Sequence, residues 1–276
     1  MVNFNGTISS STNDFSFTNR AFLYGDAVFE TLKIVDSKIL FFEDHYFRLM
    51  ASMRILRMEI PQYFTLEFIE EQLLATAKKN NLDYSARARL TVFRNDGGLY
   101  LPKDNSVSFI IQVAPLENKS YVYNNQLYEV DLYKDFYIQK HLLSTLKTTN
   151  RIINVTGSIF AQENDLSNCL LLNNEKNIVE ALNGNIFMFT NNTLVTPHKT
   201  EGCINGILRK QLIDLCKKEQ INVLEQAISP FDLQKADELF ITNVIIGIQP
   251  ITKYRKKEFN TSFSIELLKK LNSLLF

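Results

Sequence analysis

Lys147 stands in the stretch LLSTLKTTNRIINV, where an extended segment gives way to a helical pattern and small hydroxyl residues lie on both sides. A lysine whose pKa is lowered by burial becomes a nucleophile that attacks carbonyl carbons. Most lysines are only solvated surface groups, so the immediate context of Lys147 leaves both interpretations open. Covalent chemistry at Lys147 therefore needs support from residues elsewhere in the chain.

Glu180 lies in the stretch NIVEALNGNIFMF, followed by the tight turn Asn183-Gly184-Asn185 between two short strand patterns. A carboxylate held at such a strand end can pair with a protonated ring nitrogen. The plain alternative is an ordinary glutamate at the end of a strand. Glu180 is thus a candidate partner for a heteroaromatic ring.

Gly202 and Gly206 bracket a loop, EGCINGILRKQL, that runs directly into a helical pattern. The backbone N–H groups and the dipole at a helix N-terminus suit a phosphate. Arg48, on another predicted helix, can add a forked donor to the same phosphate. The alternatives are a glycine-rich loop that only starts a helix and an arginine in a surface salt bridge.

An amine for a Schiff base, a carboxylate for a pyridinium and a phosphate cradle are the three supports that pyridoxal 5'-phosphate needs. The sequence therefore predicts this cofactor. Other chemistries lack their motifs, because no phosphate loop of the GxxxxGK[ST] type, no GxGxxG and no HExxH occurs. We expect no metal site.

The patterns along the chain predict an α/β (α+β) protein of two domains. Strands are expected around the Asn5-Gly6 turn, in AVFETLKIV and ILFF, over 86–94 and in SVSFIIQVA; helices in EDHYFRLMASMRILRM, ended by Pro61, and after the cap Thr65. The polar stretch 115–125 is predicted to link a smaller N-terminal domain (1–114) to a larger cofactor-binding domain (126–276).

The second half repeats the mixture of helices and strands. We expect strands in LYEVDLY, NCLLLNN, NIFMFTN and ELFITNV, and helices in RIINVTGSIFAQEN, ILRKQLIDLCKKEQ and the tail SFSIELLKKLNSLL. Glu180 thereby falls at a strand end and Lys147 just before a helix.

Composition narrows the class of protein. The chain has 276 residues, 45% hydrophobic and 22% charged, with a formal net charge of +0. A basic nucleic-acid surface is not indicated, and no apolar run is long enough to span a bilayer. Three widely spaced cysteines give no disulfide framework, and the polar start is not a secretory signal, so we expect a cytoplasmic protein.

With these residues in place, the chain resembles the class IV aminotransferases, the fold-type IV pyridoxal phosphate enzymes, from about Phe4 to Ile251. Six stretches carry the resemblance: NRAFLYGDAVFETLKI, EDHYFRLMAS, the Lys147 region, VEALNGNIF, TPHKTEGCINGILR and ADELFITNVIIGIQPI. The family includes branched-chain aminotransferases, D-amino-acid aminotransferases and aminodeoxychorismate lyases.

The resemblance implies a fold and a set of roles. The fold is that of the D-amino-acid aminotransferases, two α/β domains with the cofactor in the cleft between them, usually as a homodimer acting on a small amino substrate. Lys147 falls on the lysine that binds the cofactor and Glu180 on the carboxylate that pairs with the pyridine nitrogen. The remaining expected cofactor contacts are Arg48, Asn185, the backbone N–H groups of Gly206 and Ile207, Thr242 and Asn243.

The motifs also bear on which activity to expect. Branched-chain enzymes typically have threonines where this chain has Leu208 and Val244. The patterns K-x-x-N-R, N-G-I-L-R and FITNV are more similar to aminodeoxychorismate lyases, although Leu99 stands where lyases often have an arginine. We therefore expect conversion of 4-amino-4-deoxychorismate to 4-aminobenzoate and pyruvate, a step of folate biosynthesis. The alternative is a branched-chain or D-amino-acid aminotransferase that uses 2-oxoglutarate.

Two residues are expected near the substrate. Arg94 matches the place of an arginine that holds a carboxylate in D-amino-acid enzymes, although Asp96 replaces the histidine expected beyond it. A strand-end arginine in a salt bridge is the alternative. Tyr24 is expected to pack near the cofactor from the first strand motif, or else to belong to the core.

A non-catalytic binding protein on the same fold is the remote alternative. Loss of the lysine would be its expected mark, whereas this chain keeps Lys147, Glu180 and Arg48 together. In the enzymatic interpretation the freed Lys147 acts as general base and removes a proton next to the substrate amine.

Overall fold

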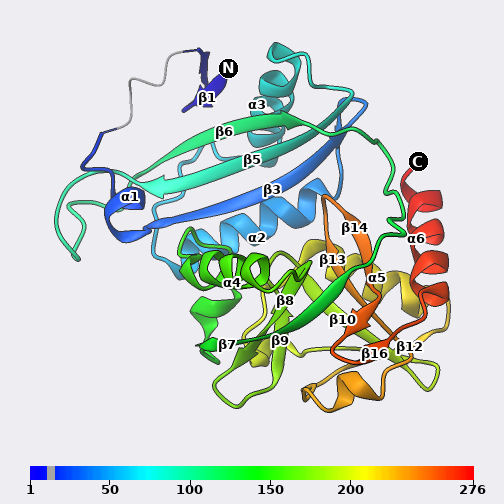
Figure 1. Cartoon of the computed structure of the whole chain (residues 1–276). Helices are drawn as coiled ribbons and strands as arrows, with labels where there is room; N and C mark the ends of the chain where they lie inside the picture. The colour runs from blue at the N-terminus through cyan, green and yellow to red at the C-terminus, as the bar shows by residue number, and fades with distance from the viewer. Residues whose placement is uncertain (11–15) are drawn as a thin grey trace. The chain divides into compact units, whose positions relative to one another are not determined.

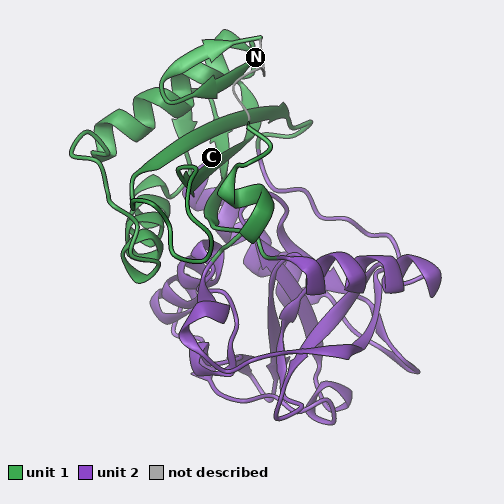
Figure 2. Ribbon diagram, turned by 90° about the vertical axis from the view of Figure 1, so that its left-hand side faces the viewer, with its two compact units in different colours: residues 1–119, 147–150 green, residues 120–146, 151–276 purple. Residues whose placement is uncertain are grey.

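The computed structural model describes residues 1–10 and 16–276, which form two compact units (Figure 2). Unit 1 comprises Met1–Lys119 together with Lys147–Asn150, and unit 2 comprises Ser120–Leu146 and Arg151–Phe276. The change from one unit to the other thus falls at Lys119–Ser120, and a short segment around Lys147 returns to unit 1. The domain limits 1–114 and 126–276 stay a prediction.

Unit 1 is built on a six-stranded sheet in the order β2-β1-β6-β5-β3-β4, and all its strand pairs are antiparallel. Its elements are β1 (Val2–Phe4), β2 (Thr7–Ser9), α1 (Arg20–Tyr24), β3 (Ala27–Val35), β4 (Lys38–Ile39), α2 (Phe42–Ile55), α3 (Leu66–Lys79), β5 (Ser85–Arg94) and β6 (Val107–Pro115).

Helices α2 and α3 supply the apolar side chains that cover one face of this sheet (Figure 1). Successive residues of a strand point to opposite faces, so alternate positions of β3 and β5 reach this core. The fully buried side chains include Leu32, Leu90, Phe109, Leu49, Met53 and Leu73. The other alternate positions of β3 and β5 carry a mixture of apolar, polar and charged groups, among them Phe29, Lys33, Arg87 and Arg89.

Most of the elements predicted for this half are present. The Asn5-Gly6 turn joins β1 to β2, and the hydroxyl of Thr65 accepts the N–H of Phe68 at 3.2 Å as the predicted N-cap of α3. The predicted strand ILFF is present only at its first residue: β4 pairs with β3 as a hairpin but ends at Ile39. Phe41 has φ +56°, a left-handed conformation that ends the extended backbone before α2.

Tyr24 belongs to a short helix and not to a strand. Helix α1 ends at Tyr24, and Gly25 caps it in the left-handed conformation with φ +63°. A Cβ on Gly25 would lie 2.3 Å from Oδ1 of Asn150, so the turn accepts only glycine. The strand predicted for the motif around Tyr24 therefore begins at Ala27.

Unit 2 contains two five-stranded sheets, in the orders β12-β11-β10-β13-β14 and β16-β15-β7-β8-β9. Its strands are β7 (Glu129–Ile138), β8 (Asn168–Asn173), β9 (Ile178–Ala181), β10 (Asn185–Thr190), β11 (Thr193–Thr196), β12 (Asn222–Glu225), β13 (Glu238–Asn243), β14 (Gly247–Ile251), β15 (Lys253–Tyr254) and β16 (Lys257–Glu258). Both sheets contribute to one apolar core, which includes Leu170, Ile186, Ile241 and Tyr254.

Three helices of unit 2 match the predicted patterns closely. They are α4 (Ile152–Glu163), α5 (Ile207–Lys218) and α6 (Ser262–Leu275). Short 3-10 turns occur at Leu142–Thr145, Lys199–Glu201 and Asp232–Gln234. Within the described ranges 1–10 and 16–276, no helix is long and apolar enough to cross a membrane.

Candidate functional site

Lys147 is held against strand β3 of unit 1 by backbone hydrogen bonds. The N–H of Phe29 donates to the carbonyl of Lys147 at 2.8 Å, and the N–H of Thr149 donates to the carbonyl of Ala27 at 3.0 Å. These two bonds make a short antiparallel bridge, centred on Val28. The backbone on both sides of the candidate nucleophile is therefore hydrogen-bonded to β3 as in a short strand pair.

The side chain of Lys147 lies over an aromatic ring that it shares with an arginine. Its Nζ atom is 4.5 Å from the ring centroid of Phe29, and Cζ of Arg89 is 3.7 Å from the same centroid. Both contacts are within the range of cation–π attraction. Arg89 comes from β5, where it lies opposite Thr31 of β3.

Arg89 and Arg87 make a half-buried cationic pair on one face of β5. The two residues are separated by one position, so their side chains leave the same face of the strand. Burial lowers the pKa of Arg89, and the neighbouring charge of Arg87 lowers it further. In the described part of the chain, neither residue forms an ion pair with a carboxylate, and Arg89 donates only a long bond of 3.3 Å to the hydroxyl of Thr91.

Arg48 is bound by a buried carboxylate from β3. Its Nε donates to Oε1 of Glu30 at 2.8 Å, and its Nη2 donates to Oε2 of the same residue. Nδ1 of His45 lies 2.7 Å from Oε2 of Glu30 as well. Helix α2 carries Arg48 and His45 on one face, because the two residues are three positions apart.

The protonation states within this cluster follow from its geometry. Burial raises the pKa of the Glu30 carboxyl, but Arg48 and His45 outweigh burial and hold this pKa at about 2. Burial lowers the pKa of His45, and the charges of Arg48 and Lys147 lower it further, against the Glu30 carboxylate. In the contact between them Nδ1 of His45 carries the proton, because the carboxylate can only accept a hydrogen bond.

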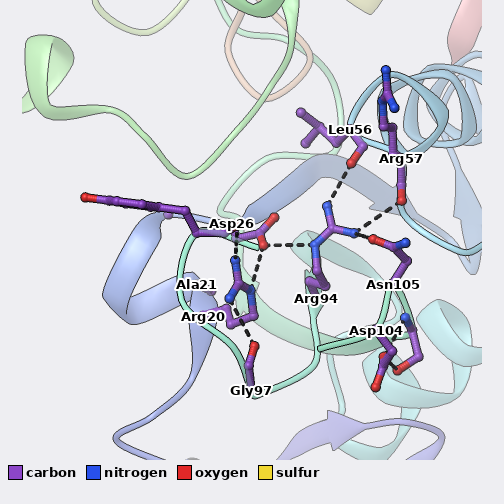
Figure 3. Close-up of polar contacts among 12 residues, drawn as sticks. Arg20, Ala21, Asp26, Leu56, Arg57, Arg94, Gly97, Asp104 and Asn105 are labelled. Atoms are coloured by element: carbon purple, nitrogen blue, oxygen red, sulfur yellow. Dashed lines mark hydrogen bonds and ion pairs between the residues drawn. The ribbon is translucent and has the colours of Figure 1, made fainter. Parts of the chain in front are cut away.

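Arg94 is enclosed by groups of the protein itself (Figure 3). Its Nε donates to Asp26 at 2.9 Å, its Nη2 donates to the carbonyl of Leu56 at 2.7 Å, and its Nη1 contacts Arg57 O and Asn105 Oδ1. The side chain is only 7% exposed. These contacts favour the alternative given for Arg94, a strand-end arginine in a salt bridge.

Tyr24 is connected to the same network. The guanidinium of Arg20 lies 4.9 Å from the Tyr24 ring centroid, and its Nε donates to Oδ2 of Asp26 at 2.9 Å, the oxygen that also accepts from Arg94. The Tyr24 ring also contacts Tyr100 at 5.8 Å between centroids. Tyr24 and Arg94 thus share a network within unit 1.

In unit 2, Glu180 and Asn185 hold the loop that precedes α5. Oε2 of Glu180 accepts the N–H of Ile204 at 2.9 Å, and Nδ2 of Asn185 donates to the carbonyl of Ile204 at 2.9 Å. A Cβ on Gly206 would lie 1.9 Å from Oδ1 of Asn185, so another residue here would push the Asn185 amide away from the carbonyl of Ile204. The loop backbone is fixed on both sides just before the helix begins.

The N-terminus of α5 has the properties of an anion site. Gly206 is the N-cap and provides no side chain to bond the first N–H groups of the helix, which begins at Ile207. Thr242 of β13 lies opposite Asn185 in the strand register, and its buried hydroxyl has no hydrogen-bond partner in residues 1–10 and 16–276. A buried hydroxyl without a partner marks a place where a ligand oxygen can bind.

Asn243 orders the turn between β13 and β14. Its Oδ1 accepts the N–H groups of Ile245 and Ile246, each at 3.0 Å, and its Nδ2 donates to the carbonyl of Asn183 at 2.9 Å. Gly247 then completes the turn with φ +74°. Asn243 therefore joins this turn to the turn that follows Glu180.

The structure groups the predicted residues into two sets. Unit 1 contains Lys147, Arg48, Arg94 and Tyr24, and unit 2 contains Glu180, Asn185, Gly206, Ile207, Thr242 and Asn243. Sequence reasoning missed Glu30, His45 and Arg89. Alternation in AVFETLKIV could have indicated Glu30, since a carboxylate at a core-facing position requires a cationic partner.

A family model described as amino-transferase class IV matches residues 27–254 of the chain. A putative branched-chain-amino-acid aminotransferase of Methanocaldococcus jannaschii is 31% identical to this chain, over 93% of this chain and 88% of that protein. A D-alanine aminotransferase of Listeria monocytogenes is 27% identical, over 85% of this chain and 80% of its own length.

The fold agrees with these similarities in sequence. The crystal structure of a putative 4-amino-4-deoxychorismate lyase from Legionella pneumophila superposes with a TM-score of 0.86 at 25% identity, and the match covers 96% of each chain. The expected family and the α/β fold-type IV architecture are both confirmed. The chain belongs to the class IV aminotransferases, a family of enzymes that depend on pyridoxal phosphate.

Proposed function

We propose that this chain binds pyridoxal 5'-phosphate, with Lys147 as the residue that holds the cofactor covalently. The donors present fit the group. Lys147 supplies an amine on a backbone that is hydrogen-bonded to β3, and the N-terminus of α5 supplies backbone N–H groups beside Gly206. The unpartnered hydroxyl of Thr242 fits a phosphate oxygen. Arg48 adds a cation to the proposed phosphate ligands, and Asn185 and Asn243 hold the turns.

Pyridoxal phosphate, when bound, supplies an aldehyde that joins amines and a ring that withdraws electrons from the substrate carbon next to the amine. Nζ of Lys147, once released by the incoming substrate amine, removes the proton from that carbon. The Glu180 carboxylate keeps a proton on the ring nitrogen, because an anion favours the protonated form of a neighbouring base. Its second contact, with the N–H of Ile204, fixes its orientation.

Among the reactions of this family, we propose aminodeoxychorismate lyase activity. The observation that carries this proposal is the pair Arg87 and Arg89, of which Arg89 shares the ring of Phe29 with Lys147. Aminodeoxychorismate has two carboxylates, and a partly desolvated cationic pair without its own carboxylate partner suits such a dianion. Loss of the proton and expulsion of pyruvate then leave 4-aminobenzoate.

The contacts of Arg94 change which arginine we assign to the substrate. All three nitrogens of its guanidinium have partners in the protein, so a substrate carboxylate would have to displace them. Arg89 requires no such displacement. We therefore propose Arg89, and not Arg94, as the residue that holds a substrate carboxylate.

An aminotransferase that uses 2-oxoglutarate is the second candidate. The identity of 31% with a putative branched-chain enzyme favours it, and Arg89 could equally bind the distal carboxylate of 2-oxoglutarate. In this case Nζ of Lys147 would hold and move the proton taken from the substrate, and the bound cofactor would supply the chemistry by which the amino group is kept and water releases a keto acid. Both candidates share the first proton transfer.

One assay separates the two candidates. The protein is incubated with aminodeoxychorismate while 4-aminobenzoate and pyruvate are followed, in parallel with L- and D-amino acids plus 2-oxoglutarate. Release of pyruvate without amino transfer supports the lyase. Transfer from leucine, isoleucine, valine or D-alanine without pyruvate release identifies an aminotransferase.

The variant Lys147→Ala tests the cofactor assignment itself. We expect it to lose turnover and the visible absorption of lysine-bound pyridoxal phosphate while its thermal unfolding stays cooperative. Lys256→Ala, which removes an exposed lysine of unit 2, is the matched control. Turnover retained in Lys147→Ala, or a wild-type protein that takes up no cofactor, would refute the assignment.

We also propose a homodimer in the cytoplasm. The family expectation supports the dimer, and the unpaired, buried thiols of Cys169, Cys203 and Cys216 suit a reducing compartment. Light scattering coupled to gel filtration tests the dimer, since a monomer would elute at about half the expected mass.

A further inference from the structure

The guanidinium of Arg48 is fixed along one edge before any ligand binds. The two carboxylate oxygens of Glu30 accept hydrogen bonds from Nε and Nη2 of Arg48 in a forked arrangement. The Glu30 side chain is 3% exposed and the Arg48 side chain 12%. Glu30 therefore sets the direction of the whole Arg48 guanidinium.

Glu30 is in turn fixed by a histidine that is otherwise poorly satisfied. Nδ1 of His45 lies 2.7 Å from Oε2 of Glu30, while its buried Nε2 has no hydrogen-bond partner in the part of the chain that the structure describes. Burying an imidazole nitrogen without a hydrogen-bond partner costs free energy of folding. Its single bond is thus directed at Glu30, which it helps to orient.

The position of Glu30 on β3 connects this cluster to Lys147. Phe29 and Glu30 are successive residues, so their side chains leave opposite faces of the strand. Phe29 lies under the Lys147 amine on one face, and Glu30 binds Arg48 on the other. Strand β3 therefore sets the orientation of both groups from adjacent positions.

We infer that Glu30 is a positioning residue, which orients the guanidinium of Arg48 for the phosphate of the cofactor. This inference rests on the proposed function, since it assumes that Arg48 contacts that phosphate. Glu30 does not touch the cofactor itself. It acts only through the orientation of the arginine.

Two physical effects of Glu30 oppose one another, which makes the inference testable. The negative charge of Glu30 weakens the attraction of the cluster for an anion. Its forked bond restricts Arg48 to one orientation and so removes an entropic cost from binding. If orientation dominates, loss of Glu30 weakens phosphate binding; if charge dominates, loss of Glu30 strengthens it.

The experiment uses the variant Glu30→Gln and two probes, pyridoxal phosphate and pyridoxal, which lacks the phosphate. Affinity is measured for the apoenzyme by quenching of its tyrosine fluorescence and by the visible absorption of the lysine-bound probe. We expect the affinity for pyridoxal phosphate to fall about tenfold, as for loss of a charge-assisted hydrogen bond, and that for pyridoxal to stay within about twofold. Glu219→Gln, at an exposed ion pair with Lys270, is the matched control.

The double variant Glu30→Gln/Arg48→Met completes the test and guards against misfolding, because it leaves no unpaired arginine in the cluster. If Glu30 acts through Arg48, the Glu30→Gln change has no further effect on pyridoxal phosphate affinity once Arg48 is absent. Equal losses for both probes, additive effects in the double variant, or tighter binding by Glu30→Gln would overturn the inference. Failure of the wild-type protein to bind pyridoxal phosphate would instead refute the proposed function.

Discussion

Strand β5 carries arginines in two contrasting environments. Arg94, at its end, shares the Asp26 carboxylate with Arg20 and donates to two backbone carbonyls (Figure 3). Arg87 and Arg89 have no carboxylate partner in the described residues, although burial lowers the pKa of Arg89. All three guanidinium nitrogens of Arg94 bind groups of the protein. Arg89, in contrast, contacts the same Phe29 ring as the Lys147 amine.

The difference follows from strand geometry. The even-numbered positions of β5 from Ala86 to Val92 are buried in the core, and Arg94 continues this series. Arg87 and Arg89 occupy odd positions on the opposite face. An arginine on the core side must find partners within the protein, whereas arginines on the other side can serve a ligand.

The largest expected effect concerns the enclosed arginine. Arg94→Met should lower the free energy of unfolding by about 3 kcal/mol, since it removes one partner of a buried ion pair and leaves carbonyl groups without donors. Urea denaturation of the apoprotein measures this loss. Arg54→Met, at an exposed position of α2, should change stability by less than about 0.5 kcal/mol. A stable Arg94→Met protein with impaired substrate binding would reverse our comparison.

The sequence was sufficient for the type and order of most elements, because their hydrophobic periods are strong. Helix α6 and the Thr65 cap of α3 lie where the patterns predict them. The strand predicted for ILFF is shorter than expected, because Phe41 adopts a left-handed conformation that no local pattern indicates. Boundaries of this kind are set by packing, in this case by Phe42 entering the core with α2.

The candidate site was predicted less evenly. The sequence context predicts roles for Lys147, Glu180 and the loop before α5. Arg89 becomes a candidate only through its contact with the ring of Phe29, a residue 60 positions away in the chain. Register between β3 and β5 brings these two side chains together, and a single sequence does not give register. Glu30 was missed because its partners, His45 and Arg48, come from α2, and the sequence does not show which side chains of that helix pack against β3.

A second prediction concerns the paired carboxylate of Glu30 and how its contribution to stability varies with pH. The pKa of Glu30 is held at about 2 in the folded protein, below its ordinary 4.5, so the unfolded chain binds more protons in this range. Its contribution to stability is therefore complete above pH 4.5 and is lost as the pH falls towards 2. Between these limits the stability difference between wild type and Glu30→Gln should shrink by about 3 kcal/mol.

Unfolding free energies from urea titrations at several acidic pH values check this expectation. Glu219→Gln serves as the control, because Glu219 is in an exposed ion pair that solvent screens. A difference between wild type and Glu30→Gln that does not vary with pH would mean that the carboxylate is not paired as described.

A third prediction concerns Arg89. Arg89→Met should lower kcat/KM for a dicarboxylate amine such as aminodeoxychorismate by about 100-fold, the loss expected for a charge-assisted contact. Unfolding should change little, since the loss of a long bond to Thr91 and of the cation–π contact with Phe29 is offset by removal of a partly buried charge that Arg87 repels. Steady-state kinetics check the first expectation and thermal denaturation the second. An equal loss for a monocarboxylate such as alanine would show that Arg89 acts on the cofactor region in general.

The smallest effect is expected for Arg87. It lies two positions before Arg89 on β5, farther from the pairing position of Phe29, and the cations over the Phe29 ring are Arg89 and Lys147. Arg87→Met should lower kcat/KM for the same dicarboxylate by about tenfold, as a supporting charge rather than a direct partner. It should also slightly stabilise the protein, because the charge of Arg87 acts unfavourably on Arg89. The double variant with Arg89→Met separates a shared subsite from two independent effects: a shared carboxylate gives a loss clearly smaller than the product of the single losses. Multiplicative losses would assign the two arginines to different carboxylates, and no loss in Arg87→Met would reduce the cationic pair to Arg89 alone.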